Sequence, residues 1–229
     1  MKKYLILFAI IFTFSNGIFA QASKKDPVDV LGWYGSSCTK NLPKKWEVYV
    51  NYQARYYNNL KTYNGSYITI GGSKKLNKYL ELMGDYRLAL VNKGTYNRFT
   101  IGAEASKKVN KFNYAFRLEI QNQLQDFIDT SKSNDNSGYW RTRFGGKYSI
   151  NKKAEVYASV EPVMKFGGNY FIDNIKNTVG FKYKILPQLK LDLYYVYRPD
   201  YAKSYNRLYH IIGFNADYTI KKSKKKHKK

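Results

Sequence analysis

The sequence predicts an all-β protein, namely a closed antiparallel up-and-down transmembrane β-barrel of 10–12 strands preceded by a signal peptide. Three observations lead to this fold class. Apolar and polar residues alternate with a period of two over long segments from residue 46 onward. Aromatic residues make up 17% of the chain, including 24 tyrosines, and such side chains favour the pleated surface of a sheet. The one long apolar run lies at the N-terminus, and a mean hydropathy of -0.58 excludes a helical membrane protein.

The N-terminus has the pattern of an export signal. Lys2 and Lys3 precede an apolar run at 4–14, and the small residues Ala20 and Ala22 follow it. The run is too short to cross a membrane as a helix, which disfavours the alternative of an uncleaved anchor. We therefore expect a signal peptide at 1–22, a barrel at 23–220 and a Lys-rich disordered tail at 221–229. With one cysteine, Cys38, the chain cannot form an intramolecular disulfide.

The alternation defines the expected strands. It is strict at 46–56 and 112–124, and it recurs at 65–75, 79–91, 96–108, 138–149, 154–165, 173–185, 189–199 and 206–220, with a weaker candidate at 30–38. These segments reach the length of about 9–11 residues that a tilted strand needs to cross a bilayer. Antiparallel closure favours an even strand count. We therefore expect either that 30–38 is a partial strand or plug, or that a longer segment such as 58–75 is divided.

The connections alternate between short and long, as in outer-membrane barrels, where the short turns face the periplasm. Short turns are expected near 41–45, 76–78, 109–111, 150–153 and 186–188, and longer polar loops at 58–64, 92–95, 126–137, 166–172 and 200–205. Three of the short turns share a motif in which Asn77, Asn110 or Asn151 precedes a lysine. Asparagine tolerates the positive φ of tight turns, so we interpret the motif as a hairpin repeat.

In a membrane barrel the apolar face of each strand contacts lipid and the polar face lines the interior. The predicted inward face carries charges of both signs, and buried charges persist when they are paired. We therefore expect an interior filled by an Arg–carboxylate network. An alternative is a polar binding site or narrow pore lined by Arg141 and Arg143. The predicted lumen-lining residues are Arg55, Asp85, Arg87, Arg117, Glu119, Arg141, Arg143 and Glu161.

The lysines are placed differently from the arginines, because most of them flank the short turns. The formal net charge is +24, which indicates anionic partners such as lipid phosphates or lipopolysaccharide. A basic rim near an anionic surface gains roughly 1 kcal/mol per residue. Protection of the turns and strand ends is an equally good interpretation. The predicted periplasmic basic rim comprises Lys44, Lys45, Lys74, Lys75, Lys107, Lys108, Lys152 and Lys153.

The sequence offers little catalytic chemistry. His210 is expected to point outwards beside Ile212 and Phe214, and His227 lies in the basic tail. The chain has no HExxH, paired-cysteine or GxSxG motif, so a zinc hydrolase or an elbow-serine hydrolase is disfavoured. Glu155 and Glu161 form only a weak glycosidase signal, since carboxylates inside a barrel are more often arginine partners. We predict no catalytic residue, no metal site and no cofactor.

The chain resembles an uncharacterised family of bacterial outer-membrane β-barrels catalogued as a domain of unknown function. The likeness covers nearly the whole mature chain and implies export, a barrel in the outer membrane and no established activity. One departure is that nine residues, 221–229, follow the final strand. The resembling segments are 31–34 (LGWY), 42–46 (LPKKW), 55–57 (RYY), 139–144 (YWRTRF), 161–162 (EP) and the final motif Gly213-Phe214-x-x-Asp217-Tyr218.

The leading interpretation is thus a non-enzymatic outer-membrane barrel with a structural, adhesive or minor-passage role. One alternative is a barrel enzyme acting on membrane lipid. Another is a soluble periplasmic barrel that binds an apolar ligand, with the two faces reversed. Expected partners are outer-membrane lipids, lipopolysaccharide and the barrel-assembly machinery. Nucleic acid is not expected, because lysines and tyrosines do not interleave in one patch, and the protein is expected to be a monomer.

Overall fold

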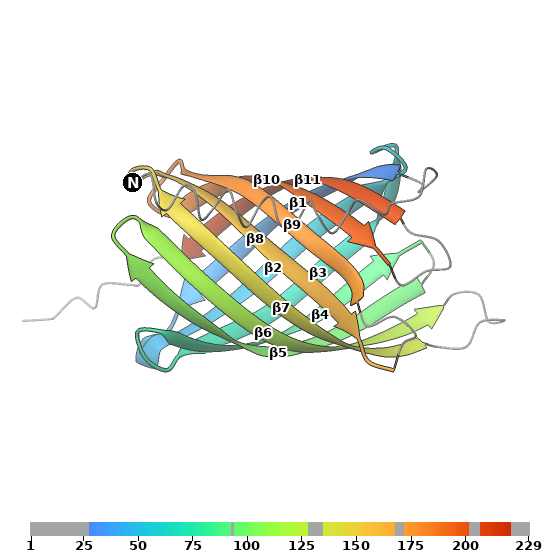
Figure 1. Ribbon diagram of the computed structural model, residues 1–229, viewed down its shortest axis with the longest axis horizontal. Coiled ribbons are helices and arrows are strands. Elements are labelled where there is room, and N and C mark those ends of the chain that lie inside the picture. The colour runs from blue at the N-terminus through green and yellow to red at the C-terminus, as the bar shows by residue number, and fades with distance from the viewer. Residues whose placement is uncertain (1–27, 93, 128–134, 168–171, 202–206, 221–229) are drawn as a thin grey trace, which may run out of the picture.

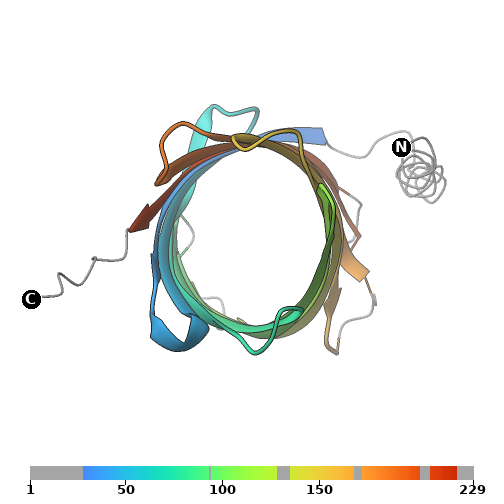
Figure 2. The same cartoon turned by 90° about the vertical axis from the view of Figure 1, so that its left-hand side faces the viewer.

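A computed structural model describes residues 28–92, 94–127, 135–167, 172–201 and 207–220, which form one closed barrel (Figures 1 and 2). The predicted signal peptide and the Lys-rich tail lie outside the described residues. Among the described residues, no helix is long and apolar enough to cross a membrane. The predicted all-β closed barrel of 10–12 strands is confirmed, and the signal peptide stays a prediction.

The described part of the chain contains eleven strands and one short 3-10 turn, η1 (Pro43–Lys45). The alternating segments predicted from the sequence correspond to these strands one by one. The strands are β1 (Val28–Asn41), β2 (Trp46–Tyr57), β3 (Thr62–Lys75), β4 (Leu80–Val91), β5 (Gly94–Val109), β6 (Phe112–Phe127), β7 (Asp135–Ser149), β8 (Ala154–Lys165), β9 (Ile172–Lys184), β10 (Leu189–Asp200) and β11 (Arg207–Ile220).

Each strand pairs antiparallel with its neighbour in the chain, and β1 closes the ring by pairing with β11 in parallel. The parallel register runs from Val28 opposite Leu208 to Lys40 opposite Ile220. The expectation of an even strand count was therefore wrong, because the weak segment at 30–38 is a full strand. An odd count places the start of β1 at the long-loop rim and the end of β11 at the short-turn rim.

The two faces of the barrel differ sharply in chemistry. Large apolar side chains lie exposed on the outside, for example Ile101 at 67% and Phe144 at 56% exposure. The small buried apolar cluster of Leu31, Val196 and Ile211 lies on the inner face, where β1, β10 and β11 meet. Since burial of apolar side chains normally stabilises a water-soluble core, this reversed distribution indicates an apolar solvent around the barrel.

Tyrosines on the inner face pack over glycines of the neighbouring strand. Tyr157 lies opposite Gly180, and Tyr194 lies opposite Gly213. A Cβ added to either glycine would come within 2.3 Å of the tyrosine ring, so both glycines leave room for an aromatic ring to lie flat on the sheet. The rings let inward tyrosine hydroxyls reach partners, as Tyr157 does by donating to Asp192 at 2.9 Å.

Two of the three repeated asparagine turns have a different cause from the one the sequence suggested. Among the three, Asn110 has a positive φ of 54° and Asn77 and Asn151 do not. The Oδ1 atoms of Asn77 and Asn151 instead accept hydrogen bonds from the backbone N–H groups two and three residues ahead, at 2.7–2.9 Å. Side-chain acceptance of this kind is the other way in which asparagine stabilises a tight turn. The short turns lie together at the left-hand end in Figure 1.

Candidate functional site

The charged side chains of the inner face are the candidate site, and strand register brings them together. On adjacent strands Glu104 lies opposite Arg117, and Arg117 lies opposite Arg143. Glu119 lies opposite Arg141 in the next inward row. Because residues two apart point to the same face, the charged residues at these positions on β5–β9 all face inwards.

We name the connected set of ion pairs across β5–β9 the ion-pair belt. It runs Arg143–Glu104–Arg117–Glu119–Arg141–Glu161–Lys176, so that each acid has two cationic partners. The nitrogen–oxygen distances along this path are 3.5 Å, 2.6 Å, 3.4 Å, 3.3 Å, 2.7 Å and 3.0 Å.

Burial varies along the ion-pair belt. The side chains of Glu119 and Glu161 are only 7% exposed, whereas Arg141 is 15%, Arg117 24% and Arg143 35% exposed. The two buried carboxylates are thus enclosed by their cations, while the arginines keep one side open to the lumen. A buried carboxylate is costly unless it is paired and hydrogen-bonded, and Arg141 meets this need by donating from both Nε and Nη2 to Oε1 of Glu161.

A second charged group crosses the parallel seam. Lys182 lies 3.2 Å from Asp192 and 4.0 Å from Asp217, and the Ser37 hydroxyl on β1 donates to Asp217 at 2.6 Å. These contacts join β9, β10, β11 and β1. The seam is therefore held by inward polar contacts in addition to its backbone ladder.

The remaining predicted lumen residues lie towards the long-loop end. Arg55 is sandwiched between the rings of Trp33 and Tyr67, at 4.3 Å and 3.9 Å from the ring centroids. Arg87 donates from Nε to the Thr69 hydroxyl at 2.8 Å. Asp85 lies 3.9 Å from Arg98, which alternation along β5 also places on the inner face.

Lys176, Lys182 and Asp217 were missed by the predicted lumen set. The lysines follow the strict alternation of β9, where Thr178 and Gly180 lie between them on the same inward face. Lys182 lies close to the short turn after β9, and lysines near short turns were expected at the rim. Alternation on β9 was the signal that could have placed them inside.

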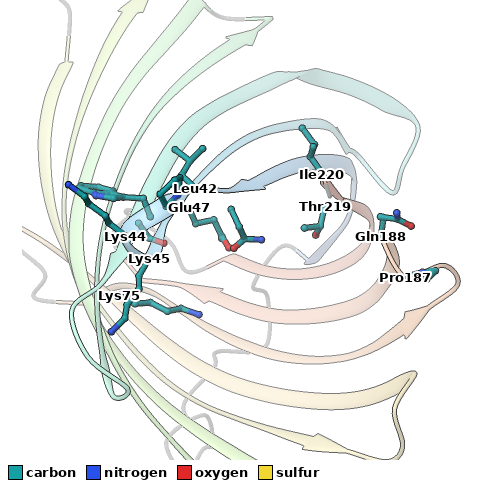
Figure 3. Close-up of a pocket in the computed structure, with 13 residues that line it drawn as sticks. Leu42, Lys44, Lys45, Glu47, Lys75, Pro187, Gln188, Thr219 and Ile220 are labelled. Carbon is teal, nitrogen blue, oxygen red and sulfur yellow. The ribbon is translucent and has the colours of Figure 1, made fainter. Parts of the chain in front are cut away.

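The predicted rim lysines all lie at the short-turn end. Lys44 and Lys45 adopt positive φ in η1, and Lys74 lies over the ring of Trp46 on the outside. A cavity of about 650 Å³ opens at this end, lined by residues of η1, β2, β3 and the turn before β10. Figure 3 shows the lysines on one side of this mouth, facing Gln188 and Ile220. The other rim lysines are Lys75, Lys107, Lys108, Lys152 and Lys153, all exposed.

Catalytic or metal-binding groups are sparse in the described part of the chain. No group of three or more His, Cys, Asp or Glu residues that could hold a metal ion occurs among the described residues. His210 points outwards, as the sequence suggested, and its Nδ1 lies 2.6 Å from the Tyr195 hydroxyl on the outer face. The histidine is thus separated by the barrel wall from the inward charges.

Comparison with solved structures gives the same architecture. A structure described as the NanC porin matches with a TM-score of 0.51 and 14% identity, covering 74% of this chain and 86% of that one. At this identity the likeness supports the fold alone. OccK8 (OprE) of Pseudomonas aeruginosa aligns with a TM-score of 0.35 and 10% identity over 69% of this chain and 54% of its own, which is too slight to bear on the fold.

Sequence comparison identifies the family. No curated protein matches the chain in sequence. The profile of one family matches residues 31–209, which is most of the chain and includes ten complete strands or nearly so. The chain therefore belongs to the family described as "Protein of unknown function (DUF2490)".

Proposed function

We propose that this protein spans the bacterial outer membrane and forms a narrow, water-filled passage for small polar solutes. The apolar exterior and the closed ring of strands support the membrane location, since a closed barrel satisfies every backbone hydrogen bond in lipid. The strands have 12–16 residues, enough to cross a bilayer at a tilt. Export by the predicted signal peptide accords with this location.

The observation that carries the passage is the partial exposure of charges deep in the barrel. Arg117 and Arg143 keep 24% and 35% exposure although both face inwards and lie away from the ends of their strands. These exposed fractions leave the ion-pair belt accessible to water, which a fully packed interior would prevent. Barrel diameter grows with strand number. With eleven strands, this barrel is intermediate between barrels of about eight strands, whose interior is filled by side chains, and barrels of about 16 strands, which contain an aqueous channel.

In this proposal the ion-pair belt both stabilises the wall and narrows the lumen. Its fixed charges favour small, hydrated solutes and exclude apolar ones. In this proposal the role is non-enzymatic, because the carboxylates of the ion-pair belt are paired with cations and His210 lies on the opposite face.

Conductance across planar bilayers tests the passage. We expect the refolded protein to give small, discrete conductance steps. Ser159 faces inwards and Ala158 outwards on β8, so Ser159→Trp should lower the unit conductance by about half, because lumen side chains set the pore radius. Ala158→Trp serves as the matched control and should leave the conductance unchanged. A bilayer that stays silent after verified insertion would refute the passage and leave a structural barrel.

We further propose that the short-turn rim faces the periplasm, as in other bacterial barrels. This orientation places the rim lysines beside inner-leaflet phosphates. In a Cys38→Ser background, Lys152→Cys should react with a membrane-impermeant maleimide only after the outer membrane is permeabilised. Asn59→Cys, in the turn between β2 and β3 at the opposite rim, should react on intact cells. The reverse pattern would contradict the orientation.

A further inference from the structure

Two arginines lie directly opposite each other on adjacent strands at two places in the barrel. Arg117 of β6 faces Arg143 of β7, and Arg87 of β4 faces Arg98 of β5. Like charges directly opposite destabilise a sheet unless something neutralises them. At the first pair, Glu104 supplies a carboxylate 2.6 Å from Arg117 and 3.5 Å from Arg143. The second pair has no such bridge.

The charges around Arg87 and Arg98 leave a local positive excess. Among the described residues, Arg87 makes no ion pair within 4.0 Å, and Arg98 makes one, at 3.9 Å to Asp85. The guanidinium of Arg55 adds a third positive charge to this neighbourhood, and its Nε donates to Gln53 at 2.7 Å. Asp85 is the carboxylate nearest to Arg98 and also acts electrostatically on Arg87. We name Arg55, Arg87 and Arg98 the arginine cluster.

The same place contains polar atoms without a partner. Two possible donors, the Nε of Arg98 and the Oγ1 of Thr100, are buried and make no hydrogen bond, and the acceptor Oδ1 of Asp85 makes none either. Thr100 lies opposite Asp85 one inward row from the two arginines. Buried donors in native structures nearly always have partners, so unpaired ones beside unneutralised charges indicate a site for a bound group.

The charged groups around the arginine cluster include others from neighbouring strands. Arg141 and Glu119 act electrostatically on Arg98, and Arg198 acts on Arg55. Arg141 and Glu119 are already paired within the ion-pair belt, and Arg198 is paired with Asp200 at 2.9 Å. These neighbours therefore do not supply the missing counter-charge.

We propose that the arginine cluster binds an oxyanion, the carboxylate or phosphate group of a small solute, within the lumen. Guanidinium groups present planar pairs of donors that match both groups. The bound oxyanion occupies the role that Glu104 has at the other arginine pair, and Thr100 offers a further donor. The location inside a passage rests on the proposed function, whereas binding itself does not require conduction.

This site can be tested with the refolded, detergent-solubilised protein. The protein is titrated with inorganic phosphate, and separately with acetate, at constant ionic strength. Binding is detected by calorimetry and by the shift in unfolding temperature. Arg98→Gln and Arg87→Gln should each weaken phosphate binding by about tenfold or more, as expected for loss of a charged hydrogen bond. Lys182→Gln removes an equal inward charge from the seam and should change affinity less than about twofold.

Several outcomes would decide against the site. Absence of binding by both anions, or an equal loss in Lys182→Gln, would overturn it, since the latter would mean general attraction by net charge. Arg98→Lys keeps the positive charge but loses the planar pair of guanidinium donors. Since the net charge is unchanged, its effect on folding should be small, but phosphate binding should weaken at least several-fold. Phosphate binding without bilayer conductance would refute the passage and support the oxyanion site. Conductance without phosphate or acetate binding would support the passage and refute the site.

Discussion

Replacing Glu161 by glutamine is expected to lower the free energy of unfolding by about 3 kcal/mol, because it leaves buried cations without their carboxylate. Glu161 lies 2.7 Å from Arg141 and 3.0 Å from Lys176, and it is the one carboxylate paired with Lys176 among the described residues. Arg141 retains Glu119 at 3.3 Å, which keeps the loss near the lower end of the range for broken buried pairs. Equilibrium unfolding by denaturant of the protein in lipid vesicles measures this loss in the free energy of unfolding.

Glu155→Gln is the matched control on the same strand. Glu155 also faces inwards but makes no ion pair within 4.0 Å among the described residues. Its substitution should change stability by less than about 0.5 kcal/mol. Equal effects of the two substitutions would mean that the ion-pair belt contributes nothing specific to stability.

Replacing Ile101 by arginine is the second change with a large expected effect. Among the described residues, Ile101 is the most exposed large apolar side chain of the outer face, at 67%, and it lies midway along β5. In a lipid-facing position near the bilayer centre an arginine costs about 2–4 kcal/mol. On a water-exposed surface the same change costs about 0.5 kcal/mol or less. Unfolding from lipid vesicles distinguishes these values.

Leu76→Arg provides the comparison at the membrane edge. Leu76 lies in the turn after β3 and is 44% exposed. A charge at the interface should cost no more than about 1 kcal/mol. A gradient from Leu76 to Ile101 is therefore the expected signature of a bilayer, and similar small costs at both positions would contradict a lipid-facing exterior.

Alternation alone was enough to predict the strands and most of the inward charges. It placed Arg117, Glu119 and Arg141 on the inner face, because a period of two is local and survives in a single strand. It could not pair them, since contacts such as Arg143–Glu104 join strands two apart around the ring. Such pairs depend on barrel shear and side-chain reach, which no local pattern records.

The seam and the turns show a second limit of the sequence. The inner face of β1 is mostly small or apolar and its outer face carries Ser36, Cys38 and Lys40, so alternation is weak there. Its strand character arises from pairing with β2 and β11. The roles of Asn77 and Asn151 likewise depend on whether the side chain or the backbone satisfies the turn, and composition does not distinguish the two.

Tryptophan quenching by lipids with brominated acyl chains tests most directly the claim that apolar residues face the bilayer and charges face the lumen. Trp140 lies on the outer face, where its Nε1 donates to Thr142, and Trp33 lies on the inner face against Arg55. In variants that keep one of these tryptophans and replace the others by phenylalanine, brominated lipid should strongly quench Trp140 and leave Trp33 nearly unaffected. Equal fluorescence of Trp140 in brominated and ordinary lipid would contradict the account.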